Sequence, residues 1–196
     1  MSGSILRQAI AARTIVSDGS FEIMRGIMKT NIRFLIAATL IWSMPALAVD
    51  QGDEAPKWQA ISFQDKAVSF PELSEGRPTV MIFWASWCDY CAAFMPYLKK
   101  IQEDYGTDRI SIVAVNAKEK DGDPEAYVKK FDFPVTAIRN GDEIAAAYGV
   151  KFIPGLMVVD GGGTVSYRRG WTELPAGKTV AQLWSEQVRT ALDQAL

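Results

Sequence analysis

The chain has 196 residues, 48% of them hydrophobic, and a formal net charge of −2. Five basic and two acidic residues precede Val49, which leaves 16 basic and 21 acidic residues in the rest of the chain. Such an acidic chain lacks the basic patch of a nucleic-acid-binding protein, so no nucleic-acid partner is expected. With no histidine and only two cysteines, it also lacks the four ligands of a zinc site, and no metal is expected.

The first part of the chain has the pattern of an export signal. Residues 28–33 form a short basic start, residues 34–42 are almost continuously apolar, and residues 46–48 read Ala-Leu-Ala. These three features in this order are typical of a secretory signal peptide with a small-residue cleavage site. We therefore predict a signal peptide over residues 28–48, cleaved after Ala48, and a periplasmic location.

Two alternatives concern this leader. Residues 1–27 show no clear pattern, which favours translation from Met28 and an upstream extension over residues 1–27; the alternative is a genuine long leader. An uncleaved leader would instead anchor the protein to the inner membrane. The 16 residues from Phe34 to Val49 include Pro45 and fall short of the roughly 20 that span a bilayer, which favours cleavage.

Residues 49–196 have the length of a single domain. Apolar and polar side chains alternate over residues 55–70, which predicts a hairpin at the edge of the domain. A short helical turn is expected over residues 71–73. The apolar run from Val80 to Trp84 then predicts a buried central strand.

Both cysteines follow this strand, in the sequence Cys88-Asp89-Tyr90-Cys91. Beyond them the apolar residues recur at helical spacing, which predicts a helix to about Tyr105 whose first turn carries both thiols. Pro96 lies inside this helix and is expected to kink it.

The spacing of the cysteines predicts redox chemistry. Positions three apart share a helix face, so the two sulfur atoms can reach bonding distance. Unpaired N–H groups and the helix dipole stabilise a thiolate at a helix start, and such motifs lower a cysteine pKa to roughly 3.5–7.5. We predict Cys88 as the attacking thiol and Cys91 as the more buried resolving thiol, with their redox-active disulfide in place of any cofactor. A purely structural bridge is a weaker reading, because closing so short a loop removes little chain entropy.

The two residues between the cysteines are expected to tune the pair. Asp89 places a negative charge beside the Cys88 thiolate, which should raise the pKa of Cys88 and favour the role of a reductant. Tyr90 is the second tuning position.

The remainder of the chain alternates strand and helix patterns, which predicts an α/β fold with one mixed sheet flanked by helices. Strands are predicted over Ile110–Val115, Val135–Ile138, Leu156–Val159 and Thr164–Arg169, and helices over Asp123–Phe131, Asp142–Tyr148 and Thr179–Ala195. The residues expected to face inward on the last helix are Val180, Leu183, Trp184, Val188 and Leu192.

The cysteine motif and its surroundings resemble a known family. Trp84-Ala85-Ser86-Trp87-Cys88-x-x-Cys91, with Pro96 five residues on and Ile153-Pro154 far downstream, is similar to the thioredoxin fold. More narrowly, the chain resembles the exported TlpA/ResA-type thiol–disulfide oxidoreductases, a group that includes the cytochrome c-maturation thioredoxins.

Two further features support this narrower group over residues 53–191. Ala55-Pro56 forms the entry to the predicted hairpin at the N-terminus of the domain. The 38-residue spacing from Asn116 to Pro154 leaves room for the helix and strand, at about 124–138, that the group inserts into the centre of the fold.

The resemblance also implies roles for particular residues. Pro154 would be a cis proline that faces the cysteines, and the backbone of Ile153 would pair with an extended substrate segment. Trp84 and Trp87 would flank the disulfide, with Trp87 as an apolar contact surface for the partner. The implied partners are protein dithiols and disulfides and a membrane-bound electron donor, and the implied activity is that of an exported protein-disulfide reductase.

Three positions depart from the pattern of the group. Gly155 stands where the group usually has threonine, Phe94 where its reducing members carry glutamate, and Ile82 at the place of the buried aspartate of ordinary thioredoxin. Both usual proton acceptors for Cys91 are therefore absent, and Glu119 is the candidate substitute.

Other functions compatible with the residues are a metal carrier and other redox enzymes. A Cu(I) carrier would use Cys88, Cys91 and Met95, since soft sulfur ligands select that ion. An oxidant or isomerase of exported proteins would use the same cysteines, although no histidine lies between them. A peroxidase would need a threonine and a proline before the attacking cysteine, and residues 83–86 supply neither.

Overall fold

The structure is a computed structural model that describes residues 48–171 and 173–196. The upstream extension predicted over residues 1–27 lies outside the described residues, and so does the predicted signal peptide except for Ala48. Across the two described ranges, no helix is both long and apolar enough to cross a membrane.

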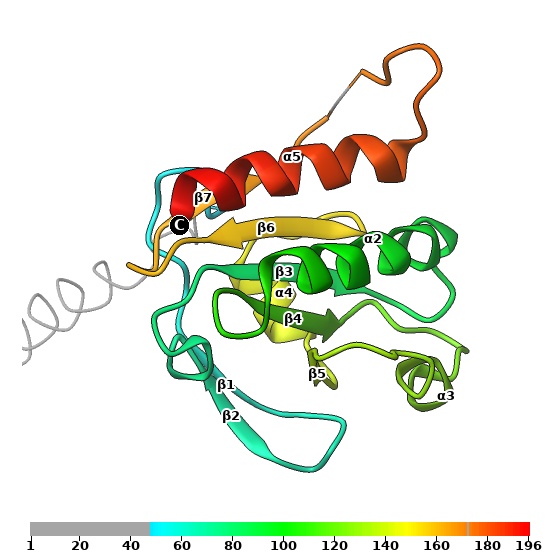
Figure 1. The fold of residues 1–196 in the computed structure, drawn as a ribbon. Coiled ribbons are helices and arrows are strands. Elements are labelled where there is room, and N and C mark those ends of the chain that lie inside the picture. Colours follow the sequence, from blue (N-terminus) through cyan, green and yellow to red (C-terminus); the bar gives the residue numbers. More distant parts are fainter. Residues whose placement is uncertain (1–47, 172) are drawn as a thin grey trace, which may run out of the picture. The chain divides into compact units, whose positions relative to one another are not determined.

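A five-stranded mixed sheet runs through the centre of the domain (Figure 1), as the alternating patterns predict. The strands are β3 (Thr79–Trp84), β4 (Ser111–Asn116), β5 (Thr136–Ile138), β6 (Gly155–Val159) and β7 (Val165–Arg168). They lie in the order β5-β4-β3-β6-β7. β3, β4 and β5 are parallel, whereas β6 is antiparallel to β3 and β7 is antiparallel to β6. Every residue of β3 and β6 is buried, which explains their continuous apolar runs.

A two-stranded antiparallel hairpin precedes the sheet and confirms the prediction for residues 55–70. Its strands are β1 (Trp58–Ile61) and β2 (Ala67–Phe70), followed by the short helical turn η1 (Glu72–Ser74). Trp58 stacks on Phe70 with ring centroids 5.7 Å apart. Both rings belong to a buried cluster with Phe83 of β3, which holds the hairpin against the domain.

The α-helices of the described residues are α2 (Asp89–Tyr105), α3 (Pro124–Val128), α4 (Asp142–Ala147) and α5 (Val180–Ala195). Side chains at the N-caps of three of them accept backbone N–H groups: Cys88 for α2, Asp123 for α3 and Thr179 for α5. α2 continues through Pro96 as one helix. The prediction that both thiols lie in its first turn is wrong for Cys88, which has extended backbone angles and precedes the helix.

α3 is shorter than predicted and ends at Val128 instead of Phe131. The backbone N–H groups of Lys130 and Phe131 bond to carbonyls three residues back, so the chain leaves the α-helix in tight turns. These turns bring Phe131 edge-on to Trp84, with ring centroids 5.6 Å apart.

α5 buries most of its predicted inner face. Trp184, Val188 and Leu192 are buried, whereas Val180 and Leu183 are half-buried. The small residues Ala181 and Ala191 are buried as well, because they lie on the same side of the helix.

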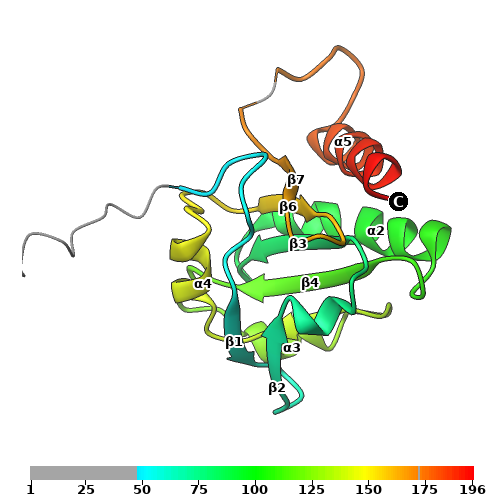
Figure 2. The same cartoon turned by 90° about the vertical axis from the view of Figure 1, so that its left-hand side faces the viewer.

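Alternate residues of β3 face two separate layers. Val80, Ile82 and Trp84 share a buried cluster with residues of α2 and α5, whereas Met81 and Phe83 pack with residues of α4 and the hairpin. Figure 2 shows α4 on the opposite side of the sheet from α2 and α5. β3 is the central strand of the sheet. At its carboxyl end the chain passes through residues 85–88 into α2, which places the cysteines at this end of the central strand.

Candidate active site

The two cysteines lie where the chain passes from β3 into α2. They form a disulfide, with their Cα atoms 5.2 Å apart. Cys91 is fully buried and Cys88 is 6% exposed, which agrees with the predicted difference in burial. Accessibility therefore favours Cys88 as the sulfur that meets a partner.

The start of α2 provides a hydrogen bond for the sulfur of Cys88. The backbone N–H of Cys91 donates to Cys88 Sγ at 3.2 Å. After reduction, a thiolate at Cys88 would accept this bond at the positive end of the helix dipole. Asp89 lies exposed in the first turn, where its negative charge opposes that stabilisation.

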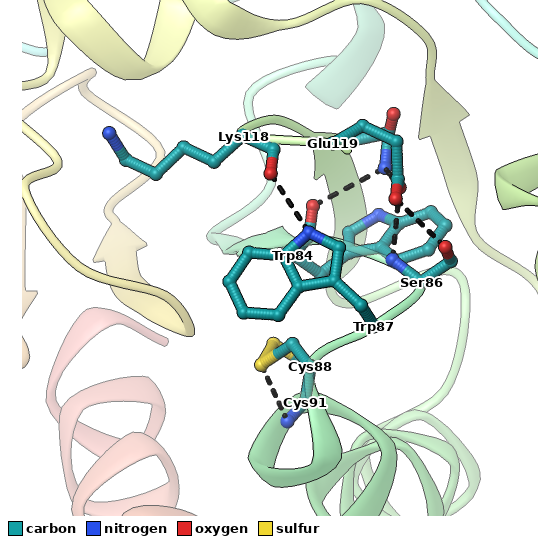
Figure 3. The surroundings of a disulfide bond; sticks show 8 residues. Trp84, Ser86, Trp87, Cys88, Cys91, Lys118 and Glu119 are labelled. Carbon is teal, nitrogen blue, oxygen red and sulfur yellow. Dashed lines mark hydrogen bonds between the residues drawn. A yellow bond between two sulfur atoms is a disulfide. The ribbon is translucent and has the colours of Figure 1, made fainter. Parts of the chain in front are cut away.

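A carboxylate from a distant part of the chain holds the segment before Cys88 (Figure 3). Glu119 accepts hydrogen bonds from the backbone N–H of Ser86 at 2.9 Å and from its hydroxyl at 2.8 Å, across 33 positions of sequence. Asn116 donates to the same carboxylate at 2.8 Å. Asn116 ends β4 in register with Trp84 at the end of β3, so the parallel strands bring these groups together.

These contacts argue against Glu119 as the proton acceptor for Cys91. Burial raises the pKa of Glu119, but hydrogen bonds from Ser86 and Asn116 outweigh it and hold the pKa below its ordinary value. A carboxylate with a lowered pKa is a weaker base. Among the described residues, no hydrogen bond joins Glu119 to Cys91. The geometry assigns Glu119 the role of positioning the loop that leads to Cys88.

A glycine allows the loop between β4 and α3 to close over Ser86. A Cβ atom at Gly122 would lie 1.9 Å from Ser86 Oγ and 2.6 Å from Glu119 Oε1. Atoms cannot approach so closely, and only a residue without a side chain permits this contact.

Trp87 presents an aromatic surface directly before Cys88 and is 44% exposed. Its indole Nε1 donates to the carbonyl oxygen of Lys118 at 3.0 Å (Figure 3). Lys120 Nζ lies 4.7 Å from the ring centroid, a cation–π contact. The ring is therefore held in place while one side stays open, which suits the contact role predicted for it.

Trp84, by contrast, is fully buried. Its ring stacks on Tyr127 at a centroid distance of 4.8 Å and lies 6.3 Å from Phe63. Tyr127 comes from the segment expected as an insertion at about 124–138, so that segment covers Trp84. Trp84 shares its buried cluster with Cys88 and Cys91, and its role is to support the disulfide from within the core.

The Ile153–Pro154 peptide bond is cis, as the resemblance implies. Pro154 is buried and directly precedes β6, where Gly155 pairs with Phe83 of β3. A Cβ atom at Gly155 would lie 2.9 Å from Val150 Cγ1 and 3.2 Å from Phe83 Cβ. The close approach of these neighbours explains why glycine stands where the related group has threonine.

A groove of about 720 Å³ runs past this proline. Ile153 and Pro154 line it together with Tyr90, so the groove reaches the cysteine motif. Tyr90 is 64% exposed and meets Trp184 of α5 with ring centroids 6.3 Å apart. No backbone hydrogen bond joins Ile153 to another described residue, so its N–H and C=O are available to a segment in the groove.

The copper alternative has few ligands in this structure. Met95, its third ligand, is 8% exposed and belongs to the same buried cluster as the cysteines. In the part of the chain that the structure describes, no group of three or more His, Cys, Asp or Glu side chains could hold a metal ion. A copper site here would depend on the sulfur atoms alone.

The sequence predicted no role at the site for Ser86, Gly122 or Trp184, although it placed Ser86 in the cysteine motif and Trp184 on the inner face of the last helix. Asn116 entered the sequence analysis only as one end of a spacing. A signal for Asn116 did exist, because polar residues at the carboxyl ends of neighbouring parallel strands meet at one edge of a sheet. The roles of the other three have no local signal, since each depends on a contact with a distant part of the chain.

Known proteins share both the sequence pattern and the fold. Residues 76–165 match the family described as thioredoxin-like. The chain is 33% identical over 147 residues to the thiol-disulfide oxidoreductase ResA of Bacillus thuringiensis subsp. konkukian, with 74% of this chain and 76% of that protein covered. It is 27% identical over 129 residues to the thioredoxin-like protein YneN of Bacillus subtilis, with 63% of this chain and 74% of that protein covered.

Among solved structures, a candidate thiol:disulfide interchange protein DsbE from Chlorobium tepidum superposes with a TM-score of 0.61. The two share 26% sequence identity, and the match covers 74% of this chain and 99% of that chain. The chain therefore shares its overall fold with this solved protein.

Proposed function

Since the chain belongs to the ResA-type thiol–disulfide oxidoreductases of the thioredoxin superfamily, we propose that it acts as an exported reductant of protein disulfides. One observation carries the proposal: the Cys88–Cys91 pair lies at a helix start beside a groove lined by Pro154, and Cys88 is the more exposed of the two cysteines, at 6% against 0% for Cys91. Thiol–disulfide exchange needs this combination of a stabilised thiolate and a place for the partner chain.

The proposed reaction moves two electrons from the cysteine pair to the substrate. The Cys88 thiolate attacks one sulfur of the substrate disulfide, which forms a mixed disulfide and releases a substrate thiolate that takes up a proton. Cys91 then loses its proton and attacks the Cys88 sulfur. This second step re-forms the Cys88–Cys91 disulfide and releases the second substrate thiol.

The groove would hold the substrate during both steps. An extended segment that pairs with the free backbone groups of Ile153 would bring its cysteine to Cys88, in the manner of strand addition. Trp87 and Tyr90, both exposed beside the disulfide, offer apolar contact area to that segment. The proposed reaction uses the Cys88–Cys91 disulfide itself as its redox centre and requires no separate cofactor.

The charge of Asp89 supports the reducing direction. A negative charge beside the Cys88 thiolate destabilises the reduced form, and a less stable reduced form gives up its electrons more readily. In an oxidising compartment the pair must be re-reduced after each turnover, so we propose a membrane-bound dithiol protein as the electron donor. Apocytochromes c, whose Cys-x-x-Cys-His segments must be reduced for haem attachment, are one fitting substrate class.

The reduction potential of the Cys88–Cys91 pair tests the direction. The purified protein would be equilibrated with dithiothreitol or glutathione mixtures, and the oxidised fraction would be followed by thiol labelling. A value near that of thioredoxin, about −270 mV, is expected for a reductant. A value near −120 mV would make the protein an oxidant instead, and an absent dithiol couple with stoichiometric Cu(I) uptake would replace the proposal with the copper carrier.

Export is tested separately from chemistry. Cell fractionation followed by mass spectrometry of the N-terminus should find a periplasmic protein that begins at Val49. A protein in the membrane fraction that retains residues 34–48 would support the anchored alternative, and a cytoplasmic protein would reject export.

A further inference from the structure

The groove beside the disulfide carries positive charge in an otherwise acidic domain. Its charged lining residues are Lys151, Arg168 and Arg169, and no carboxylate is among the described residues that line it. Residues 49–196 as a whole carry 21 acidic side chains against 16 basic ones. The charge of the groove therefore favours an anionic ligand.

The three cations differ in what they already bind. Arg168 donates to two backbone carbonyl oxygens, at 2.7 and 2.9 Å, and is part of the scaffold. Lys151 is exposed to solvent, where a single charge binds weakly. Arg169 is half-buried, and its guanidinium lies 4.9 Å from the ring centroid of Trp184. Arg169 is thus the cation that a contact with the protein keeps in place and that can still bind a ligand.

Arg169 lacks an acidic partner within the described chain. None of the ion pairs formed by the described residues involves it, and its Nε is buried without a hydrogen-bond partner among them. Burial lowers the pKa of this guanidinium, a desolvation that a bound carboxylate would offset. A guanidinium stacked on an aromatic ring keeps the planar set of donors that binds a carboxylate in bidentate fashion.

The position of Arg169 relates it to the reacting cysteine of a substrate. Its backbone N–H donates to the carbonyl of Leu156 at 2.8 Å, two residues beyond Pro154. At a rise of roughly 3.3 Å per residue, this is about 7 Å along the strand. Trp184, which supports Arg169, also meets Tyr90 of the cysteine motif. A segment in the groove would therefore pass Arg169 about two or three residues from its own cysteine.

We propose that Arg169, supported by Trp184, is a carboxylate-binding subsite that selects protein disulfides with Asp or Glu about two or three residues from the reacting cysteine. This inference rests on the proposed function, because it names the substrate class of the same groove. The occupant that we propose is an acidic segment of a protein, which the unpartnered Nε of Arg169 and the absence of carboxylates in the described lining favour.

Matched peptide disulfides test the subsite on the unmodified enzyme. Two peptides would carry one cysteine each, in a mixed disulfide with a neutral thiol, and would differ only by Asp or Asn two residues from the cysteine. The rate of exchange with the reduced protein would be followed by chromatography. We expect the Asp peptide to react roughly tenfold faster, the ratio typical of one hydrogen bond between charged groups.

Substitutions in the groove then show which side chain causes the preference for the Asp peptide. Arg169→Met keeps an apolar stem over Trp184 but removes the donors, so the Asp/Asn rate ratio should fall to about 1, while Arg169→Lys should retain part of it. Lys151→Met is the matched control, since it removes an exposed charge from the same groove and should leave the ratio unchanged. Each variant would also be assayed with the small neutral substrate bis(2-hydroxyethyl) disulfide. A rate of reduction equal to that of the unmodified protein would show that the cysteine pair is intact in that variant.

Failure of this inference differs from failure of the proposed function. Equal rates for both peptides with the unmodified protein would overturn the subsite while the reductase activity stands. Equal loss of the preference in Lys151→Met and Arg169→Met would also overturn it, because the effect would then come from the overall field of the groove. No exchange with either peptide or with the small disulfide would instead reject the proposed function.

Discussion

Replacing Glu119 by glutamine should loosen the loop that leads to Cys88. Glu119 accepts hydrogen bonds from Ser86 at 2.8 and 2.9 Å, from Asn116 at 2.8 Å and from the backbone of Lys120 at 3.4 Å. Bonds to a charged group contribute about 1.5–3 kcal/mol each, but glutamine keeps one acceptor oxygen and the site is only half-buried. We therefore expect Glu119→Gln to lower the free energy of unfolding by about 1–2 kcal/mol at neutral pH, or the melting temperature by roughly 2–8 °C.

The pH dependence of this loss identifies its cause. The fold lowers the pKa of Glu119 below its ordinary value of 4.5, so the ionised carboxylate stabilises the folded state. That contribution is complete above pH 4.5 and is lost as the pH falls through the lowered pKa of the folded protein. The stability difference between the unmodified protein and Glu119→Gln should accordingly shrink on acidification.

Chemical denaturation at several pH values between about 7 and about 3 measures this difference directly. Asp121→Asn is the matched control, because it removes an exposed carboxylate from the same loop and should change the stability little. The reasoning is refuted if Glu119→Gln is as stable as the unmodified protein at neutral pH, or if its loss is the same at every pH.

Three further predictions concern the site and its surroundings. Gly122→Ala should destabilise the protein by about 1–3 kcal/mol in thermal denaturation, because its Cβ would collide with Ser86 Oγ; an unchanged melting temperature would contradict the close contact. Cys91→Ser should accumulate a mixed disulfide with substrate, visible by non-reducing electrophoresis and mass spectrometry, whereas rapid release of substrate would reject Cys91 as the resolving thiol. In an ultraviolet pH titration, Tyr105 and Tyr167 should ionise at about pH 12, because burial raises the pKa of both; ionisation of all tyrosines near 10 would count against their burial.

Glu119 also shows where sequence reasoning stops short. Its place shortly after β4 made it a candidate base for Cys91, and Glu119 does lie beside the site. In the structure, however, its carboxylate accepts hydrogen bonds from Ser86 and Asn116, so Glu119 positions the loop that leads to Cys88. Phe94 and Ile82, both buried and apolar, occupy the positions at which the resemblance implies acids, so neither can accept the proton of Cys91.

The sequence alone determined the features that depend on near neighbours. The hairpin, the apolar strands, the approximate starts of the helices at Asp123 and Thr179, and the cysteine spacing follow from interactions over a few residues, so their patterns are visible in one chain. Even for these features, the predicted and observed ends of an element can differ. α3 ends at Val128 and not at the predicted Phe131, because the residues after it turn to pack Phe131 on Trp84.

Only the tertiary structure decided which distant groups meet. Glu119 reaches Ser86 because β4 lies beside β3, and Arg169 meets Trp184 because β7 and α5 come together beside the groove. Many pairs of carboxylate and hydroxyl, or of arginine and tryptophan, could form in a chain of this composition. Strand order and register select among them, and the small residues Gly122 and Gly155 leave the space in which the selected contacts fit.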